Sequence, residues 1–192
     1  MSLFPTEGFP MTELETRCLD AFPRWIRSLA EDATALAQLL STDSLPVEAR
    51  RFLSGGLNYV FKSLDLIPDG LEGLGFLDDA FVLRVAARFA LEVPGTKDAD
   101  MRGTLVRLAG DAPLVAELLE SDHGRFERYV KELSHGAARG RSVSEIIDDA
   151  AVRSAFVSEI HGWAKSYAAP TFSRDEKNLV KLKSFLGTKL PA

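Results

Sequence analysis

The sequence has very little cysteine and no long hydrophobic run. Its single cysteine is Cys18, which excludes an internal disulfide and is typical of a reducing compartment. The longest uncharged runs, residues 33–42 and 52–61, are 10 residues each, whereas a membrane-spanning helix needs about 20 apolar residues. The first residues lack the positive start and the long apolar stretch of a signal peptide. We therefore expect a cytoplasmic protein without a transmembrane helix.

Clusters of charge of one sign are also missing. The net charge is −5, and no long run of like charges occurs. Nucleic-acid binding favours a clustered basic surface, so we expect no nucleic-acid partner. Hydrophobic residues make up 46% and charged residues 27% of the 192 positions, which is ordinary for a globular protein. A chain of this length buries roughly 70% of its unfolded surface and needs neither metal nor disulfide to fold.

No segment alternates apolar and polar residues over the length of a strand, whereas helical spacing dominates. We therefore predict an all-α fold: a compact multi-helix domain with a short Asp-Leu-Ile-Pro-Asp turn and loop between two buried helices. The predicted helices are 12–41 (kinked or split at Pro23), 46–64, 78–93, 100–110, 113–121, 123–136, 143–168 (broken near Asp149) and a last one that Ser173 and Glu176 open and that ends near Gly187. We expect an N-terminal region, 1–96, and a C-terminal region, 97–192, packed as one globular unit.

The helix predicted at 78–93 carries only three charged residues beyond its first turn. Arg84, Arg88 and Glu92 share one narrow stripe, so the rest of this helix is expected to be buried. We predict that it is the central helix of the domain.

The most informative segment runs from Leu57 to Phe81. It places four aspartates among apolar residues and glycine: Asp65, Asp69, Asp78 and Asp79. Residues 67–70 (Ile-Pro-Asp-Gly) predict a β-turn with proline second and glycine fourth. Asp78 precedes an apolar helix and is predicted to be its N-cap, accepting a hydrogen bond from the N–H of residue 80 or 81.

The four aspartates admit three interpretations. The first is structural, with turn and helix-cap roles, and it is the one we favour. The second is a site for Mg²⁺ or Ca²⁺ or a small polar ligand, because a loop that folds back would bring the carboxylates together and such cations bind oxygen ligands. The third is acid–base catalysis. The spacing is not that of an EF-hand, whose ligands occupy alternate positions.

The same segment resembles a known family. Residues 65–69 read Asp-Leu-Ile-Pro-Asp and residues 75–79 read Gly-Phe-Leu-Asp-Asp, which is similar to the signature of the YkvA-like family, a bacterial domain of unknown function (DUF 1232). Tyr59 stands where that family has a tyrosine, and Phe76 stands where tyrosine is common. The resemblance covers roughly residues 46–93. It implies a small helical domain and, for some relatives, membrane association, and it implies no activity.

Three other groups of residues are candidates for binding. The histidines, His123, His135 and His161, are scattered and lack the spacing of a zinc site. Arg139 and Arg141 lie in a glycine-rich loop that would suit a phosphate or an acidic partner, or would simply be solvated. The last helix carries Lys177, Lys181 and Lys183 beside apolar residues, so it fits either an anionic membrane or docking on its own core.

The sequence therefore predicts a non-enzymatic interaction or scaffold protein that acts on a protein partner, with peripheral membrane contact through the last helix as one form of that role. No phosphate-binding loop and no nucleophile elbow occurs. The alternative is a metal- or small-ligand-binding domain that uses Asp65, Asp69, Asp78 and Asp79. The oligomeric state stays open.

Overall fold

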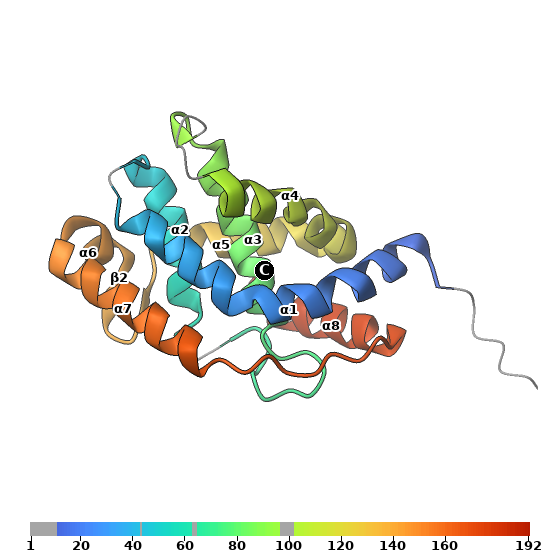
Figure 1. Cartoon of the computed structure of the whole chain (residues 1–192). Coiled ribbons are helices and arrows are strands. Elements are labelled where there is room, and N and C mark those ends of the chain that lie inside the picture. Colours follow the sequence, from blue (N-terminus) through green and yellow to red (C-terminus); the bar gives the residue numbers. More distant parts are fainter. Residues whose placement is uncertain (1–10, 43, 63–64, 97–101) are drawn as a thin grey trace, which may run out of the picture.

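The computed structural model describes residues 11–42, 44–62, 65–96 and 102–192, and it confirms the all-α prediction (Figure 1). The helices are α1 (Glu13–Leu40), α2 (Val47–Tyr59), α3 (Leu77–Glu92), α4 (Arg102–Leu119), α5 (His123–Leu133), α6 (Val143–Asp148), α7 (Ala150–Ser166) and α8 (Glu176–Lys189). The 3-10 turn η2 (Glu120–Asp122) joins α4 to α5, and a hairpin of β1 (Ala137–Ala138) and β2 (Arg141–Ser142) joins α5 to α6. No described helix is both long enough and apolar enough to cross a membrane.

Helix α1 opens with a capping box between Thr12 and Glu15 and continues through Pro23 as one helix. The predicted split at Pro23 is therefore wrong. A proline inside a helix costs about 3 kcal/mol, because it removes a hydrogen bond and crowds the preceding turn. Phe22 and Trp25 on either side are buried in the core, and their burial offsets this cost.

Helix α4 also continues through an internal proline. The sequence predicted separate helices at 100–110 and 113–121, but α4 runs unbroken through Pro113; residues 100 and 101 lie outside the described residues. Val115 and Leu118 continue the buried face beyond the proline. Packing of that face overrides the local preference for a helix end.

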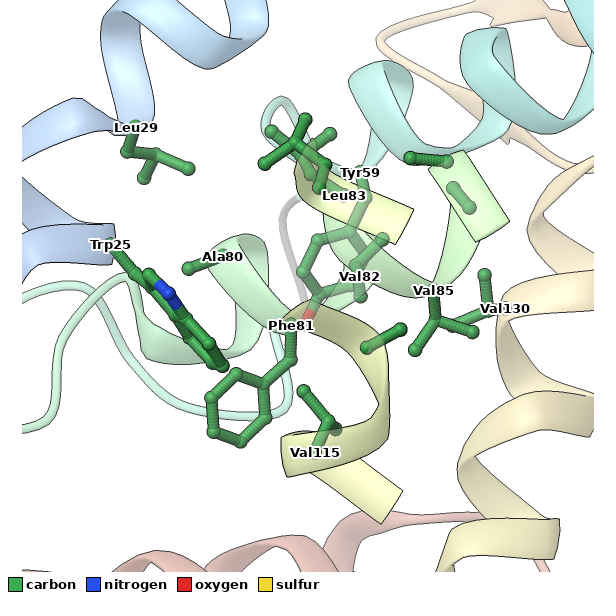
Figure 2. Packing of buried hydrophobic residues seen from close by; sticks show 14 of the residues in the cluster. Trp25, Leu29, Tyr59, Ala80, Phe81, Val82, Leu83, Val85, Val115 and Val130 are labelled. Carbon is green, nitrogen blue, oxygen red and sulfur yellow. The ribbon is translucent and has the colours of Figure 1, made fainter. Parts of the chain in front are cut away.

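Helix α3 is the centre of the molecule, as predicted. It packs against α1, α2, α4 and α5, and Figure 2 shows its side chains, among them Phe81, Val82 and Val85, surrounded by residues of the other helices. The prediction was wrong for Arg84, which is fully buried although it lies on the stripe of charged residues that was expected to be exposed. Its guanidinium stacks on the Trp25 ring at 4.1 Å.

The charge of buried Arg84 is balanced by acids on two other helices. Its Nε donates to Asp111 Oδ2 at 3.2 Å, and its Nη2 lies 3.6 Å from Oδ2 of buried Asp32. Arg107 also binds Asp32. This network ties α3 to α1 and α4, and removal of one member would leave a buried charge unpaired.

The C-terminal helices begin and end at caps that mostly follow the sequence. Ser142 and Glu145 form the predicted capping box of α6, and Asp149 separates α6 from α7 by accepting from the N–H groups of residues 151 and 152. The second predicted capping box is wrong. Asp175 caps α8, while Ser173 accepts hydrogen bonds from the Asn178 side chain.

The N- and C-terminal halves share one hydrophobic cluster. Helix α4 packs on α3, α6 packs on α2, and α7 packs on α1. Figure 1 shows α7 running beside the second half of α1, and α8 lying along the opposite end of α1. The connection between α2 and α3 is therefore held inside a single assembly of helices.

Candidate functional site

The candidate site is the connection between α2 and α3, where the four aspartates lie. Helix α2 starts after Pro46, which is its N-cap rather than a first-turn residue, and ends at Tyr59, earlier than the predicted end near residue 64. Past Tyr59 the chain tightens, because the N–H groups of Phe61 and Lys62 donate three residues back, to Asn58 O and Tyr59 O. Residues 63 and 64 lie outside the described residues, and the chain from 65 to 76 contains no helix.

The turn at the proline is placed one residue later than the sequence predicted. Leu71 N donates to Pro68 O at 2.9 Å, so the turn spans residues 68–71 instead of 67–70. The loop then folds back on itself, since a Cβ added at Gly75 would stand 2.0 Å from the Asp69 carbonyl oxygen. Only glycine fits at this close approach.

The N-cap prediction for Asp78 is wrong. Helix α3 begins at Leu77, and its N-cap is Phe76, which adopts a left-handed conformation with φ 65° and makes no side-chain cap. Asp78 is thus already inside the first helical turn. Its carboxyl group binds atoms of the α2–α3 connection instead of the helix N–H groups.

The Tyr59 and Asp78 side chains brace this connection. Tyr59 Oη donates to Asp78 Oδ2 at 2.5 Å and accepts from Leu66 N at 2.8 Å, while Ile67 N donates to Asp78 Oδ2 at 2.9 Å. Both side chains are almost fully buried, and Figure 2 shows the Tyr59 ring among the core residues of α3. One tyrosine and one aspartate thus satisfy two buried backbone donors that no helix supplies with partners.

The other three aspartates differ in how deeply they are buried. Asp79 is buried beside Asp78, Asp65 is half-buried, and Asp69 is exposed. One oxygen each of Asp65, Asp78 and Asp79 is buried without a hydrogen-bond partner. Across the described residues, no three His, Cys, Asp or Glu side chains are placed so as to hold a metal ion together.

Burial shifts the protonation of these carboxyl groups. It raises the pKa of Asp78 to about 6, although the hydrogen bonds from Tyr59 and Ile67 oppose the rise. Burial, and after it the charge of Asp78, raises the pKa of Asp65 to about 7. The same two causes raise the pKa of Asp79 well above its ordinary value. Burial therefore favours the neutral acid form of these carboxyl groups, Asp79 included.

A second tyrosine, Tyr129, lies next to Tyr59 and extends the cluster of polar side chains around Asp78 toward the surface. Lys62 Nζ donates to Tyr129 Oη at 2.8 Å, and the Tyr59 and Tyr129 rings meet edge to face with centroids 6.0 Å apart. Burial raises the pKa of Tyr129 above its ordinary value, so this hydroxyl stays protonated. The sequence does not indicate Tyr129 as part of this site, because no local pattern links a residue of α5 to a motif about 60 positions earlier.

A small cavity of about 130 Å³ opens beside Lys62 and Tyr129, between α2, α5 and the hairpin. Asn58, Tyr59 and Glu132 are among its lining residues. The buried Asn58 Oδ1 has no hydrogen-bond partner. None of the four aspartates lines this cavity, so their unpartnered oxygens do not face it.

A larger hollow of about 520 Å³ lies between α1 and α7. Its lining residues are Ala30, Glu31, Thr34, Ala35, Gln38, His161, Ala164 and Lys165. Half of them are alanine or threonine, and one acidic and one basic residue stand on opposite helices. His161 Nε2 is buried without a hydrogen-bond partner.

Arg139, Arg141 and His123 have structural partners, whereas the His135 side chain is exposed. Arg141 forms a two-pronged ion pair with Glu159 at 2.9 and 3.1 Å, and the Arg139 guanidinium stands over the Phe61 ring at 4.8 Å. His123 lies 3.5 Å from Glu127. Burial raises the pKa of the Cys18 thiol to about 11, which disfavours the reactive thiolate.

The last helix docks its apolar residues on the core. Leu179, Leu182 and Leu186 are buried. Lys183 pairs with Glu120 at 3.0 Å, whereas Lys177, Lys181 and Val180 are exposed.

Comparison with known proteins identifies this same connection. Residues 49–84 match a family described as a protein of unknown function (DUF1232). The match begins in α2 and ends in α3, so it contains Tyr59, Asp78 and the loop that they brace. No curated protein and no solved structure matches the chain.

Proposed function

We propose that this chain is a non-enzymatic interaction protein, in which the segment that matches the family is a rigid centre and the hollow between α1 and α7 receives a protein partner. The observation that carries the proposal is the hollow itself, with about 520 Å³ of space between two long helices. A groove of this kind suits the apolar face of a helix. Nucleic acid is not among the partners that we propose.

The braced aspartates support a structural role for the family segment. Asp78 Oδ2 is used by Tyr59 and Ile67, and none of the four aspartates lines the small cavity or the hollow. A general acid or base must come within hydrogen-bonding reach of a substrate. This arrangement favours a binding role for the protein over acid–base catalysis.

The residues that line the hollow support a partner of particular chemistry. Ala30, Ala35 and Ala164 leave room for a medium-sized apolar side chain, while Glu31 on α1 and Lys165 on α7 would pair with a basic and an acidic residue of the partner. A hydroxyl or amide group of the partner would supply the hydrogen bond that His161 Nε2 lacks. We therefore propose an amphipathic helix with small polar groups and both signs of charge along its edges.

Capture with matched variants tests this proposal. Ala35→Arg fills the hollow, and Val106→Arg places the same side chain at an exposed position of α4 outside it. The partner should be captured by the wild type and by Val106→Arg, lost by Ala35→Arg, and crosslinked close to Glu31 and Lys165. Equal capture by all three proteins would contradict the proposal.

A divalent cation at the aspartates is the second candidate function, favoured by the unpartnered oxygens of Asp65, Asp78 and Asp79. A bound Mg²⁺ or Ca²⁺ at 100-fold above its dissociation constant would stabilise the fold by about 2.7 kcal/mol. Thermal melts with each metal and with a chelator measure this. A shift that is absent from the Asp65→Asn, Asp79→Asn double variant would support the cation, and unchanged melts would leave the carboxyl groups with their structural roles.

Peripheral membrane contact through α8 is a further form of the interaction role. Its support is the exposed row of Lys177, Val180 and Lys181. Because Leu179, Leu182 and Leu186 of α8 are buried in the core, such contact would depend mainly on charge. Sedimentation with anionic and with zwitterionic lipid vesicles distinguishes the two cases, since only the anionic vesicles should bring the protein down.

The finer family assignment and the cellular location are also proposals. The Asp-Leu-Ile-Pro-Asp and Gly-Phe-Leu-Asp-Asp sequences support a YkvA-like bacterial protein. The single cysteine supports a cytoplasmic location. Fractionation of the native cells tests the location.

A further inference from the structure

We propose that the cavity beside Lys62 is a binding site for a small zwitterion, a molecule with one carboxylate and one ammonium group and the size of glycine or alanine. This site is separate from the hollow between α1 and α7, so it goes beyond the proposed interaction role. It lies beside Lys62 and Tyr129, at the outer end of the cluster of polar side chains that also contains Tyr59 and Asp78.

The cavity is built by three elements that are distant in sequence. Asn58 comes from α2, Lys62 from the residues after it, Tyr129 and Glu132 from α5, and Ala138 from the hairpin. These elements are fixed to one another. A Cβ at Gly55 would stand 2.7 Å from the Leu133 carbonyl group, so α2 and α5 are in close contact at the cavity wall.

Asn58 supplies an acceptor that requires a ligand. Its Nδ2 donates to the Arg141 carbonyl oxygen at 3.3 Å. A carbonyl only accepts, so this bond fixes the orientation of the amide and leaves Oδ1 as the atom without a partner. Asn58 is 3% exposed, and an unpaired oxygen at such depth destabilises the folded protein. A donor in the cavity removes that destabilisation.

Two side chains of opposite charge also line the cavity. Lys62 uses one N–H for Tyr129 Oη and keeps two donors for a carboxylate. Burial lowers the pKa of Lys62, and the charges of Asp65 and, after it, Glu132 oppose this shift. A zwitterion satisfies both, with its carboxylate on Lys62 and its ammonium group on Glu132 and Asn58 Oδ1.

The volume sets the size of the ligand. About 130 Å³ holds about four waters at the volume that water occupies in the liquid, which suits a molecule as small as glycine or alanine. Four of the ten lining residues are small, namely Gly55, Gly136, Ala137 and Ala138. An amino acid with a large side chain does not fit, and this gives the site a size limit that can be measured.

Calorimetry and thermal melts of the full chain with glycine, L-alanine, acetate, methylamine and L-phenylalanine test the site. Glycine and alanine should bind saturably and raise the melting temperature. Acetate and methylamine each lose one charged contact, so both should bind about tenfold more weakly or worse, and phenylalanine should not bind. Equal binding of acetate and alanine would overturn the zwitterion, and no saturable binding at millimolar concentration would mean that the cavity holds only water.

Variants connect the binding to these residues. Glu132→Gln changes an exposed side chain and should weaken alanine binding by about tenfold or more, whereas Glu13→Gln, at the start of α1, should leave it unchanged. Lys62→Gln should weaken binding of alanine and acetate together. Ala35→Arg should block the partner helix but leave alanine binding intact, so failure of the interaction role and failure of this site are distinguishable. Unchanged binding in Glu132→Gln would overturn the proposal.

Discussion

At the scale of single residues, the hydroxyl group of Tyr59 decides how the loop before α3 is held. It accepts from Leu66 N, donates to Asp78 and thereby orients the oxygen that also accepts from Ile67 N. Nothing else described pairs with these two backbone donors. The stability of the loop before α3 therefore depends on the hydroxyl oxygen of Tyr59, a residue of the preceding helix.

The first prediction follows from this hydroxyl. Tyr59→Phe removes it and leaves Leu66 N and Asp78 Oδ2 with fewer partners in a buried site, so we expect a loss of about 1–3 kcal/mol in the free energy of unfolding. Denaturant titration measures the loss. In a double-mutant cycle with Asp78→Asn the two losses should not add, because both variants break the same bond. Strictly additive losses would contradict the brace.

The second prediction concerns pH. The pKa of Asp78 is raised to about 6, that of Asp65 to about 7, and that of Asp79 well above its ordinary value, whereas unfolded aspartates titrate at about 3.9. The native state thus binds more protons than the unfolded state across this window. The stabilising contribution of these groups is complete below about pH 3.9 and is lost as the pH rises through the raised values.

A comparison with Asp79→Asn isolates this effect. Other acids with lowered pKa values, such as Glu15 and Glu117, act in the opposite direction, but they are common to both proteins. The free energy of unfolding of Asp79→Asn minus that of the wild type should increase from pH 4.5 to pH 8. A difference that stays constant over this range would show that Asp79 does not titrate as described.

At the scale of elements, glycines determine how closely helices approach. Gly55 and Gly110 both lie inside helices, where glycine costs about 1 kcal/mol relative to alanine. They differ in their surroundings. A Cβ at Gly55 would stand 2.7 Å from backbone atoms of Leu133 and Ser134, whereas nothing lies within 4 Å of one at Gly110.

The third prediction uses this pair. Gly110→Ala should stabilise the protein by about 0.5–1 kcal/mol, because it removes only the helix cost of glycine. Gly55→Ala should destabilise it by about 1–3 kcal/mol, because α2 and α5 must separate. Thermal melts and denaturant midpoints of the two variants measure the contrast. Equal effects of the two substitutions would mean that α2 and α5 do not meet at Gly55.

At the scale of the whole molecule, the two halves of the chain depend on one another. Helix α3 from the first half is covered by α4 and α5 from the second, and α1 is covered by α7. Without residues 97–192, the apolar faces of α1 and α3 would be exposed to water. Burial of apolar surface contributes about 25 cal/mol per Å², so a fragment that loses these contacts loses its main source of stability.

The fourth prediction is that the boundary near residue 96 does not separate two folding units. The full chain should unfold in one transition. The fluorescence of Trp25 in α1, observed in Trp163→Phe, and that of Trp163 in α7, observed in Trp25→Phe, should therefore give the same unfolding midpoint. The fragment 1–96 should lack cooperative unfolding in circular dichroism. Two separate midpoints, or a cooperatively folded fragment, would show that the halves are independent.

Much of the local structure was predictable because its causes lie close together in the sequence. Helical periodicity predicted the all-α fold and the central position of α3. Ser142 and Glu145 predicted the start of α6, and Asp149 marks the break before α7. A cap or a periodic face depends on residues three or four positions apart, so it can be recognised without knowledge of the tertiary structure.

The tertiary structure decided the rest, because the forces involved act between distant parts of the chain. Helices pass through Pro23 and Pro113 since their neighbouring faces are buried against other helices. Asp78 is not the cap because α3 already begins at Leu77, and its carboxyl group accepts instead from the hydroxyl of Tyr59, 19 positions earlier. Tyr129 and Glu132 reach the cavity only because α5 packs on α2. The sequence by itself determined the helices and the position of the acidic motif, and packing determined which atoms the motif binds.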